Sequence, residues 1–167
     1  YAGVLKATGA DVEACDTSEA AIQACRGLYH RVFAVRDSSD LASGRYDLIF
    51  STEVLEHIQD HRAALANFHR SLRPGGSLVL TTTTYGPTIF TMLYTAKNGG
   101  MHPLRIVAES MDWLRGYFSE ARRDDFVRKW CFKPLGGHLH GFMARKLRAD
   151  VRNAGFLIER QGVFYPL

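Results

Sequence analysis

Residues 46–84 decide the fold, and they read YDLIFSTEVLEHIQDHRAALANFHRSLRPGGSLVLTTTT. The stretch holds a strand-like run at 47–51, an acidic segment, a helical pattern at 60–72, a Pro-Gly-Gly turn and a second strand-like run at 77–83. Two strands joined by one helix predict a parallel β-α-β unit. Ligands bind such sheets at the carboxyl ends of the strands, so the polar residues after position 51 are candidate site residues.

The same alternation extends toward the N-terminus. Residues 11–15 and 31–35 have strand patterns, and residues 18–27 between them have apolar positions at helical spacing. Strands that alternate with helices of this length predict an α/β fold. We expect a doubly wound, Rossmann-like and mostly parallel sheet.

Composition limits the class of protein. The 167 residues are 46% hydrophobic and 23% charged, which is typical of one soluble globular domain over 1–167. No apolar run approaches the roughly 20 residues needed to cross a bilayer. The three cysteines show neither a CxxC motif nor a metal-ligand spacing. This pattern favours a reducing, cytoplasmic location.

Positive charge gathers late in the chain. Residues 101–167 hold 12 Lys and Arg against 7 Asp and Glu, within a net charge of +4. Such an excess fits an anionic substrate, nucleic acid or a membrane surface. Solvated helix faces are the more common explanation, and we expect no nucleic acid partner.

Residues 86–137 interrupt the alternation, because they contain no strand pattern. Apolar positions at helical spacing predict helices at 89–96 and 104–118, and the charged segment 120–133 keeps aromatic residues. We expect a helical insertion that acts as a substrate lid and offers a peripheral contact with a membrane. After it, a helix is predicted at 143–154 and a strand from 156 to 158.

Two acidic residues follow the first two strands. Asp16, next to Thr17, is placed to accept hydrogen bonds from ribose hydroxyls, or else to cap the following helix. Asp37 is placed to accept from an adenine amino group while the Ser38 backbone N–H meets a ring nitrogen. The alternative for Asp37 is an Asx turn within a loop.

Glu53, Glu56 and His57 form a third candidate group. Their spacing puts all three on one face of a helix. Two carboxylates and an imidazole can hold a hard divalent cation or supply a general base, for which His57 is the natural candidate. The ordinary explanation is the start of a helix, where the helix dipole stabilises acidic side chains. His138 and His140 either face the same cleft or have a surface or capping role.

Successive motifs of the chain resemble one family. Class I S-adenosylmethionine-dependent methyltransferases, above all the ubiquinone-biosynthesis O-methyltransferases, have motifs similar to DVEACDTSEAAI, RDSSDL, YDLIFSTEVLEHI and LRPGGSLVLTTTT. The late helix of the family resembles HLHGFMARKLRADVRNAGF. The resemblance covers residues 1–84 and resumes near 138. It implies methyl transfer from S-adenosylmethionine to a hydroxyl, amine or carbon of a small molecule.

The resemblance also implies a role for each candidate residue. The implied cofactor contacts are, in chain order, ribose (Asp16 and Thr17), adenine (Asp37 and Ser38) and methionine (Ser51 and Thr52). Glu53 and His57 would be catalytic. Glu53, Glu56 and His57 match a Glu-x-x-Glu-His pattern that holds a magnesium ion in some relatives.

Two features of the family have no counterpart here. Its Gly-rich loop belongs just before Tyr1, and its usual last strand belongs near the C-terminus. We therefore expect a partial domain, incomplete at the N-terminus and at the C-terminus, in which the strands beside the missing first strand lack a neighbour. Residues 1–167 alone are expected to bind the cofactor poorly.

Two other classes of protein share parts of the pattern. A nicotinamide-dependent oxidoreductase has the same sheet and the same ribose-binding acid, but its chemistry has no use for EVLEH or LRPGG. A non-catalytic Rossmann-like binding module would instead contact a membrane or nucleic acid through the basic late region.

Overall fold

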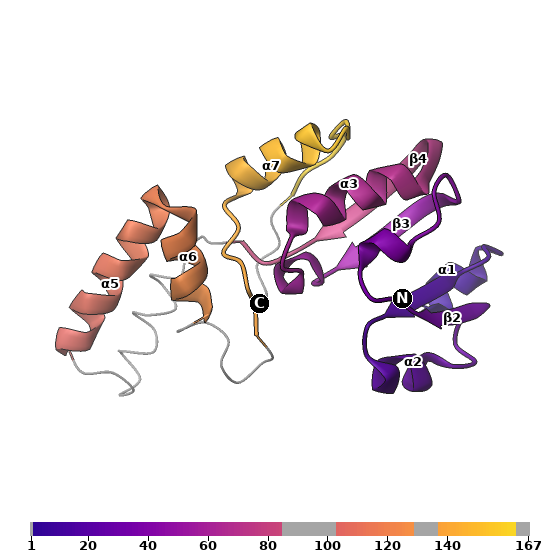
Figure 1. The fold of residues 1–167 in the computed structure, drawn as a ribbon, viewed down its shortest axis with the longest axis horizontal. Coiled ribbons are helices and arrows are strands. Elements are labelled where there is room, and N and C mark those ends of the chain that lie inside the picture. Colours follow the sequence, from indigo (N-terminus) through magenta and orange to yellow (C-terminus); the bar gives the residue numbers. More distant parts are fainter. Residues whose placement is uncertain (1, 85–102, 129–136, 163–167) are drawn as a thin grey trace.

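The computed structural model describes residues 2–84, 103–128 and 137–162, and Figure 1 shows its fold. Its elements are α1 (Ala2–Ala7), β1 (Glu13–Asp16), α2 (Glu19–Cys25), β2 (Arg31–Ala34), the 3₁₀ turn η1 (Ser38–Asp40), β3 (Tyr46–Thr52), the 3₁₀ turn η2 (Leu55–His57), α3 (His61–Ser71), β4 (Leu72–Thr81), α5 (Pro103–Phe118), α6 (Glu120–Phe126) and α7 (Ala144–Asn153). The predicted alternation of strands and helices up to β4 is confirmed.

The strands form two parallel pairs. β1 pairs with β2, so that Asp16 lies opposite Ala34, and β3 pairs with β4 from Leu48 opposite Ser77 onward. Among the described residues β1 and β3 do not pair with each other. Side chains join their amino ends instead: Glu13 pairs with Arg45 and accepts a hydrogen bond from Tyr46 Oη at 3.2 Å.

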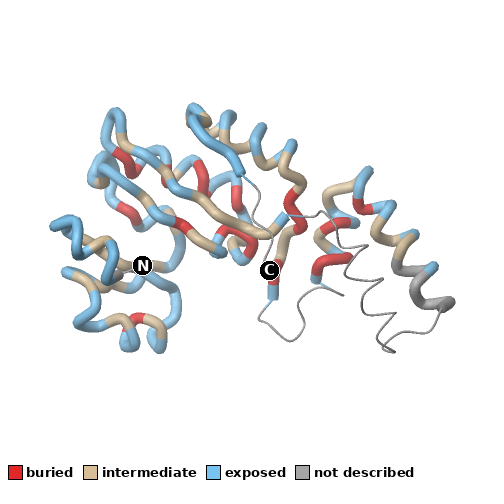
Figure 2. Tube along the Cα trace, turned by 180° about the vertical axis from the view of Figure 1, so that it is seen from behind, coloured by how far each residue is buried: buried red, intermediate tan, exposed pale blue. Residues whose placement is uncertain are grey.

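The main core lies between α3 and the β3–β4 pair. The apolar stripe predicted for this helix is confirmed, because Ala64, Leu65 and Phe68 are buried. Asp60 caps α3, since its Oδ1 accepts from Ala63 N at 2.9 Å. Around this stripe pack residues from both strand pairs, η2 and α7, namely Phe33, Ile49, Leu55, Leu78, Leu80, Leu147 and Val151. Figure 2 shows this burial, whereas the part that carries α1 and α2 is mostly exposed.

The other face of the β3–β4 pair is open in the described part of the chain. Leu48 is 46% exposed, and Phe50 and Val79 are each 39% exposed. These side chains share a face because alternate residues of a strand point the same way and Phe50 lies opposite Val79. A doubly wound sheet has helices on both faces, and the described helices cover the face that meets α3.

The Pro-Gly-Gly turn opens β4 and does not end the helix before it. α3 already ends at Ser71, and pairing with β3 changes register between Tyr46 and Leu48. Gly75 has φ 79°, which favours glycine. A Cβ on Gly76 would lie 2.9 Å from the Arg73 carbonyl oxygen. Gly75 therefore provides the turn, and Gly76 lets its backbone lie close to the Arg73 carbonyl oxygen.

The later helices are partly as expected. α5 and α7 confirm the helices predicted at 104–118 and 143–154, whereas the one predicted at 89–96 lies outside the described residues. No described helix is both long and apolar enough to cross a membrane.

The strand predicted at 156–158 is wrong. These residues form no strand, and Phe156 N donates to Val151 O at 3.3 Å, closing the end of α7. The ring of Phe156 packs against His69 with centroids 5.1 Å apart. The apolar side chain at 156 is thus explained by contact with α3, and no described strand lies beside it to complete a ladder.

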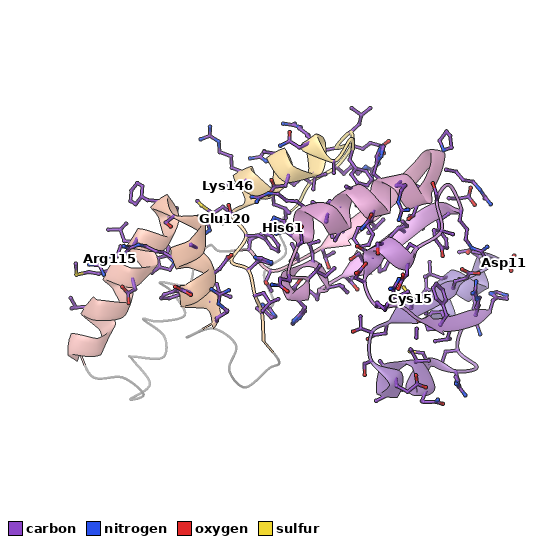
Figure 3. All side chains as sticks on the ribbon, in the orientation of Figure 1. Asp11, Cys15, His61, Arg115, Glu120 and Lys146 are labelled. Atoms are coloured by element: carbon purple, nitrogen blue, oxygen red, sulfur yellow. The ribbon has the colours of Figure 1, made fainter. Side chains whose placement is uncertain are left out.

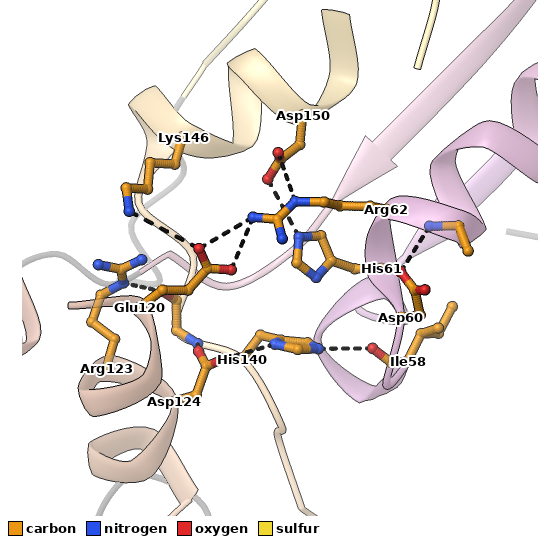
Figure 4. Close-up of polar contacts among 12 residues, drawn as sticks. Ile58, Asp60, His61, Arg62, Glu120, Arg123, Asp124, His140, Lys146 and Asp150 are labelled. Carbon is orange, nitrogen blue, oxygen red and sulfur yellow. Dashed lines mark hydrogen bonds and ion pairs between the residues drawn. The ribbon is translucent and has the colours of Figure 1, made fainter. Parts of the chain in front are cut away.

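A polar junction joins α6 to the start of α3 and to α7. Figure 3 shows His61, Glu120 and Lys146 gathered where these helices meet. Arg62 Nη2 donates to both oxygens of Glu120, at 3.0 and 3.1 Å, and Nε donates to Asp150 at 3.0 Å (Figure 4). Charged contacts therefore tie the insertion to the helices that cover the sheet.

Arg123 lies within this junction and is only 2% exposed. Its Nε donates to the Gly141 carbonyl oxygen at 2.8 Å, and its Nη1 donates to the Gly116 carbonyl oxygen at 2.9 Å. One buried side chain thus connects α5, α6 and the segment before α7.

Candidate functional site

Asp16 and Asp37 occupy equivalent places at the carboxyl ends of β1 and β2. Asp16 Oδ1 accepts from Ser18 N at 2.8 Å, and Asp37 Oδ1 accepts from Ser39 N at 2.6 Å. Both residues are exposed, as is Thr17. Both the side chain and the backbone N–H of Ser39 donate to the Asp37 carboxylate, and these bonds lower the pKa of Asp37. Each carboxylate thus holds the turn that follows its strand and is exposed to solvent.

Ser38 is engaged through its side chain. Its Oγ accepts from Asn67 Nδ2 of α3 at 3.0 Å. The side chain of Ser38 is thus occupied, and its backbone N–H is the group that we expect to contact an adenine ring. The hydrogen bond also fixes the loop after β2 against α3.

Ser51 and Thr52 end β3, as expected. Ser51 is 5% exposed, and its buried Oγ has no hydrogen-bond partner in the described part of the chain. Thr52 lies opposite Thr81 of β4 and is half-buried. A hydroxyl with unused hydrogen-bonding capacity at the end of a parallel strand is a candidate ligand contact.

The common helical face predicted for Glu53, Glu56 and His57 is wrong. Only Leu55–His57 form a turn, a single one of 3₁₀ type, and Glu53 precedes it with φ 52°. This left-handed conformation is rare outside glycine and recurs at functional sites. It turns the chain so that Glu53 Oε1 accepts from Thr81 Oγ1 at 3.0 Å.

Three threonines at the carboxyl end of β4 contact these residues, and sequence reasoning missed them. Thr81 donates to Glu53, and Thr82 Oγ1 donates to Glu56 Oε2 at 2.7 Å. Thr83 Oγ1 lies 3.2 Å from His138 Nδ1. The run of threonines at the carboxyl end of the strand was the available signal.

His138 enters the site, which settles one of the open alternatives. It is 8% exposed, and its ring centroid lies 4.7 Å from that of His57 at an angle of 86°. Leu139 N donates to the Glu56 carbonyl oxygen at 2.8 Å. Glu53, Glu56, His57 and His138 are therefore brought together from two distant parts of the chain.

His140 belongs to the polar junction instead. Its Nδ1 lies 3.1 Å from Asp124 Oδ2, and its Nε2 lies 2.9 Å from the Ile58 carbonyl oxygen (Figure 4). Both partners are acceptors, so a ring protonated at both nitrogens satisfies both contacts. The bond to Asp124 accordingly raises the pKa of His140.

The site shifts the pKa of two of its groups. Burial and the neighbouring Glu56 carboxylate raise the pKa of Glu53, and the bond from Thr81 partly offsets this. Burial, together with the nearby His57, lowers the pKa of His138. The neutral carboxyl is thus favoured at Glu53 and the neutral imidazole at His138.

The fold and these residues define a class of protein: a parallel α/β domain with ligand-binding groups at the carboxyl ends of its strands. The model of the family described as "Methyltransferase domain" matches residues 1–161, and the chain belongs to this family. The family implies S-adenosylmethionine as the methyl donor. The exposed carboxylates of Asp16 and Asp37 are hydrogen-bond acceptors, which suit the hydroxyl and amino donors of its adenosyl part.

Curated relatives agree with the family. The chain is 30% identical over 87 residues to the ubiquinone biosynthesis O-methyltransferase of Alkalilimnicola ehrlichii, covering 47% of this chain and 35% of that protein. Its counterpart from Xanthomonas oryzae pv. oryzae is 33% identical over 92 residues, covering 50% and 38%. The malonyl-[acyl-carrier protein] O-methyltransferase of Pseudescherichia vulneris is 32% identical over 106 residues, covering 60% and 42%.

The aligned part of the chain thus spans less than half the length of each of these relatives. The resemblance to methyltransferases read from the motifs is confirmed. The comparisons lend no support to a nicotinamide-dependent oxidoreductase or to a non-catalytic binding module.

Proposed function

We propose that this chain carries the adenosyl-binding and acceptor-binding parts of an S-adenosylmethionine-dependent O-methyltransferase that acts on a small molecule. The observation that carries the proposal is the pair Asp16 and Asp37, two exposed carboxylates at the carboxyl ends of adjacent parallel strands. The names of the relatives favour oxygen over an amine or carbon as the methylated atom.

The cofactor contacts follow from these positions. Asp16, beside Thr17, accepts from the ribose hydroxyls, and Asp37 with the Ser38 N–H brackets the adenine. Ser51 and Thr52, which end β3 on the other strand pair, line the methionine side. When bound, S-adenosylmethionine supplies a methyl group on a positively charged sulfur.

The acceptor needs a base. A hydroxyl releases its proton when it is methylated, and a carboxylate or imidazole within reach can take that proton. Glu53, held by Thr81, and the exposed His57 are our two candidates for this role. The remaining contribution of the site is to align the acceptor oxygen with the methyl group.

The magnesium ion expected at Glu53, Glu56 and His57 stays a prediction. Magnesium prefers oxygen ligands and keeps several waters, which two carboxylates suit. The imidazole of His57 fits that preference less well.

The cofactor proposal is tested by titrating S-adenosylhomocysteine into the full-length protein by calorimetry. Asp16→Asn keeps an acceptor for Ser18 N and removes the second carboxylate oxygen, so the turn survives. We expect affinity to fall by about 10- to 100-fold, as for one or two lost charge-assisted hydrogen bonds. Asp11→Asn, at an exposed residue before β1, is the matched control and should leave affinity unchanged. Equal affinities of Asp16→Asn and the parent protein would contradict the proposal.

The insertion 86–137 is proposed as the lid that selects the acceptor. Trp113 and Tyr117 on α5 support this, because their rings pack edge to face with centroids 4.7 Å apart and offer an aromatic surface. Trp113→Leu should change the range of acceptors more than it changes cofactor affinity. An unchanged range of acceptors would contradict the proposal that the insertion selects the acceptor.

The same insertion is proposed to contact a membrane peripherally. An exposed apolar stripe on α5 supports this, with Val107 59%, Met111 53%, Leu114 54% and Phe118 86% exposed. Flotation of the protein with anionic vesicles tests the contact, and absence from the lipid fraction would exclude it. The cytoplasmic location expected from the cysteines also stays a prediction.

A further inference from the structure

We propose that Asn67 of α3 is a positioning residue for the adenine ring of the cofactor, and that it acts through Ser38. This role rests on the proposed function, in which the adenine lies between Asp37 and the Ser38 N–H. Asn67 is 29 residues away from Ser38 and belongs to another element. No local sequence pattern links the two residues, so the contact is visible only in the folded chain.

The Asn67 amide fixes the side chain of Ser38. Asn67 Nδ2 donates to Ser38 Oγ at 3.0 Å, and both residues are half-buried. A hydrogen bond that is partly shielded from water is stronger than one in full solvent. A residue whose side chain is anchored presents its backbone N–H in one orientation, and a bond to a ring nitrogen needs such support from outside the direct contacts.

Asn67 is itself held by the core. Its neighbour Phe68 is buried, and Ala64, one turn earlier, is 0% exposed. The Asn67 carbonyl oxygen accepts at 2.7 Å from the Oγ of Ser71, which is also 0% exposed. The amide that reaches Ser38 therefore belongs to a helix that the main core fixes in place.

α3 holds the same loop at a second point. Arg70 Nη2 donates to the carbonyl oxygens of Ser39 and Leu41, at 3.1 and 3.3 Å. Residues three apart share one face of a helix, so Asn67 and Arg70 meet the loop together. Asn67 is the one of this pair that bonds to Ser38.

The adenine edge makes the role of Asn67 measurable. Adenine has an amino donor beside an acceptor nitrogen, which suits a carboxylate beside an N–H. Hypoxanthine has a carbonyl oxygen and an N–H at these two positions, which is the reverse pattern. A fixed loop rejects hypoxanthine because donor would face donor and acceptor would face acceptor. A loop that is free to shift rejects it less.

The test compares S-adenosylhomocysteine with S-inosylhomocysteine, which differ only at this edge, by calorimetry on the full-length protein. We expect the parent to prefer S-adenosylhomocysteine by about 100-fold. Asn67→Ala should lower this ratio of affinities by about 3- to 10-fold, as for one lost hydrogen bond. Asn153→Ala, at the exposed end of α7, is the matched control and should keep the ratio of the parent.

Ser38→Ala breaks the same bond from the loop side and keeps the backbone N–H. It should lower the ratio by a similar factor, and it keeps the test decisive if Asn67→Ala does not fold. The double variant should lose no more than either single variant, because each substitution removes the same bond. A general loosening of the fold would weaken both ligands equally and leave the ratio unchanged.

The outcomes separate this role from the proposed function. A parent protein that binds neither ligand would contradict the proposed function and the role of Asn67 with it. A parent that prefers S-adenosylhomocysteine, with an unchanged ratio in Asn67→Ala or Ser38→Ala, would overturn the role of Asn67 alone. Losses that multiply in the double variant would overturn it as well, since the two residues would then act independently.

Discussion

The Asp40 carboxylate holds the loop that carries Asp37. It accepts from Arg36 N at 2.8 Å, from Arg36 Nε at 3.1 Å and from Arg36 Nη2 at 2.6 Å. These contacts with Arg36 lower the pKa of Asp40 to about 2. A bidentate pair across the loop thus fixes the backbone on both sides of Asp37.

We expect this pair to make stability depend on pH. The pKa of Asp40 is lower in the folded protein than in the unfolded chain, so the contribution is complete at neutral pH and is lost as pH falls toward 2. Asp40→Asn should therefore be less stable than the parent at neutral pH, with a gap that narrows in acid. Urea unfolding from about pH 7 down to about pH 3 measures this. A gap of constant size over that range would show that the ion pair does not stabilise the loop.

Some site residues could be predicted at this scale and others could not. Asp16 and Asp37 directly follow strands, so local pattern places them. The left-handed Glu53 and the approach of His138 depend on contacts made across the fold. His138 lies 55 residues from its partner Thr83, a separation at which sequence spacing carries no information on distance.

At the scale of elements, α6 depends on one buried side chain. Arg123→Ala would leave the Gly116 and Gly141 carbonyl oxygens without their donors and open a space between α5 and the segment before α7. We expect a loss of roughly 2–4 kcal/mol in the free energy of unfolding.

The neighbouring Arg122 is exposed on the same helix and provides the control. Arg122→Ala should change stability by less than about 0.5 kcal/mol. Urea unfolding of both variants makes the comparison. Equal losses from the two substitutions would mean that burial of Arg123 does not secure the insertion.

Element boundaries show where periodicity succeeds and where it does not. The stripe in α3 and the helices α5 and α7 are predictable because 3.6-residue spacing reports burial directly. The three apolar residues after Gly155 read equally well as a strand or as a helix end that packs on a neighbour. The contact of Phe156 with His69 shows that these residues are a helix end that packs on α3.

At the scale of the molecule, two parallel strand pairs place the candidate groups of the first 53 residues at carboxyl ends of strands. The α/β class could be predicted because the alternation of strands and helices is local. The pairing of strands into a sheet could not, since it rests on contacts between segments far apart in sequence. The bridge from Glu13 to Arg45 and Tyr46 is one such contact.

The central claim is that the carboxyl ends of β1, β2 and β3 bind an adenosyl sulfonium cofactor. Hydrogen exchange of the full-length protein, followed by mass spectrometry with S-adenosylhomocysteine or NAD⁺, tests it most directly. We predict that S-adenosylhomocysteine slows exchange at 16–18, 37–39 and 51–53, and that NAD⁺ does not. Slower exchange with NAD⁺, or no change in these three segments with S-adenosylhomocysteine, would contradict the claim.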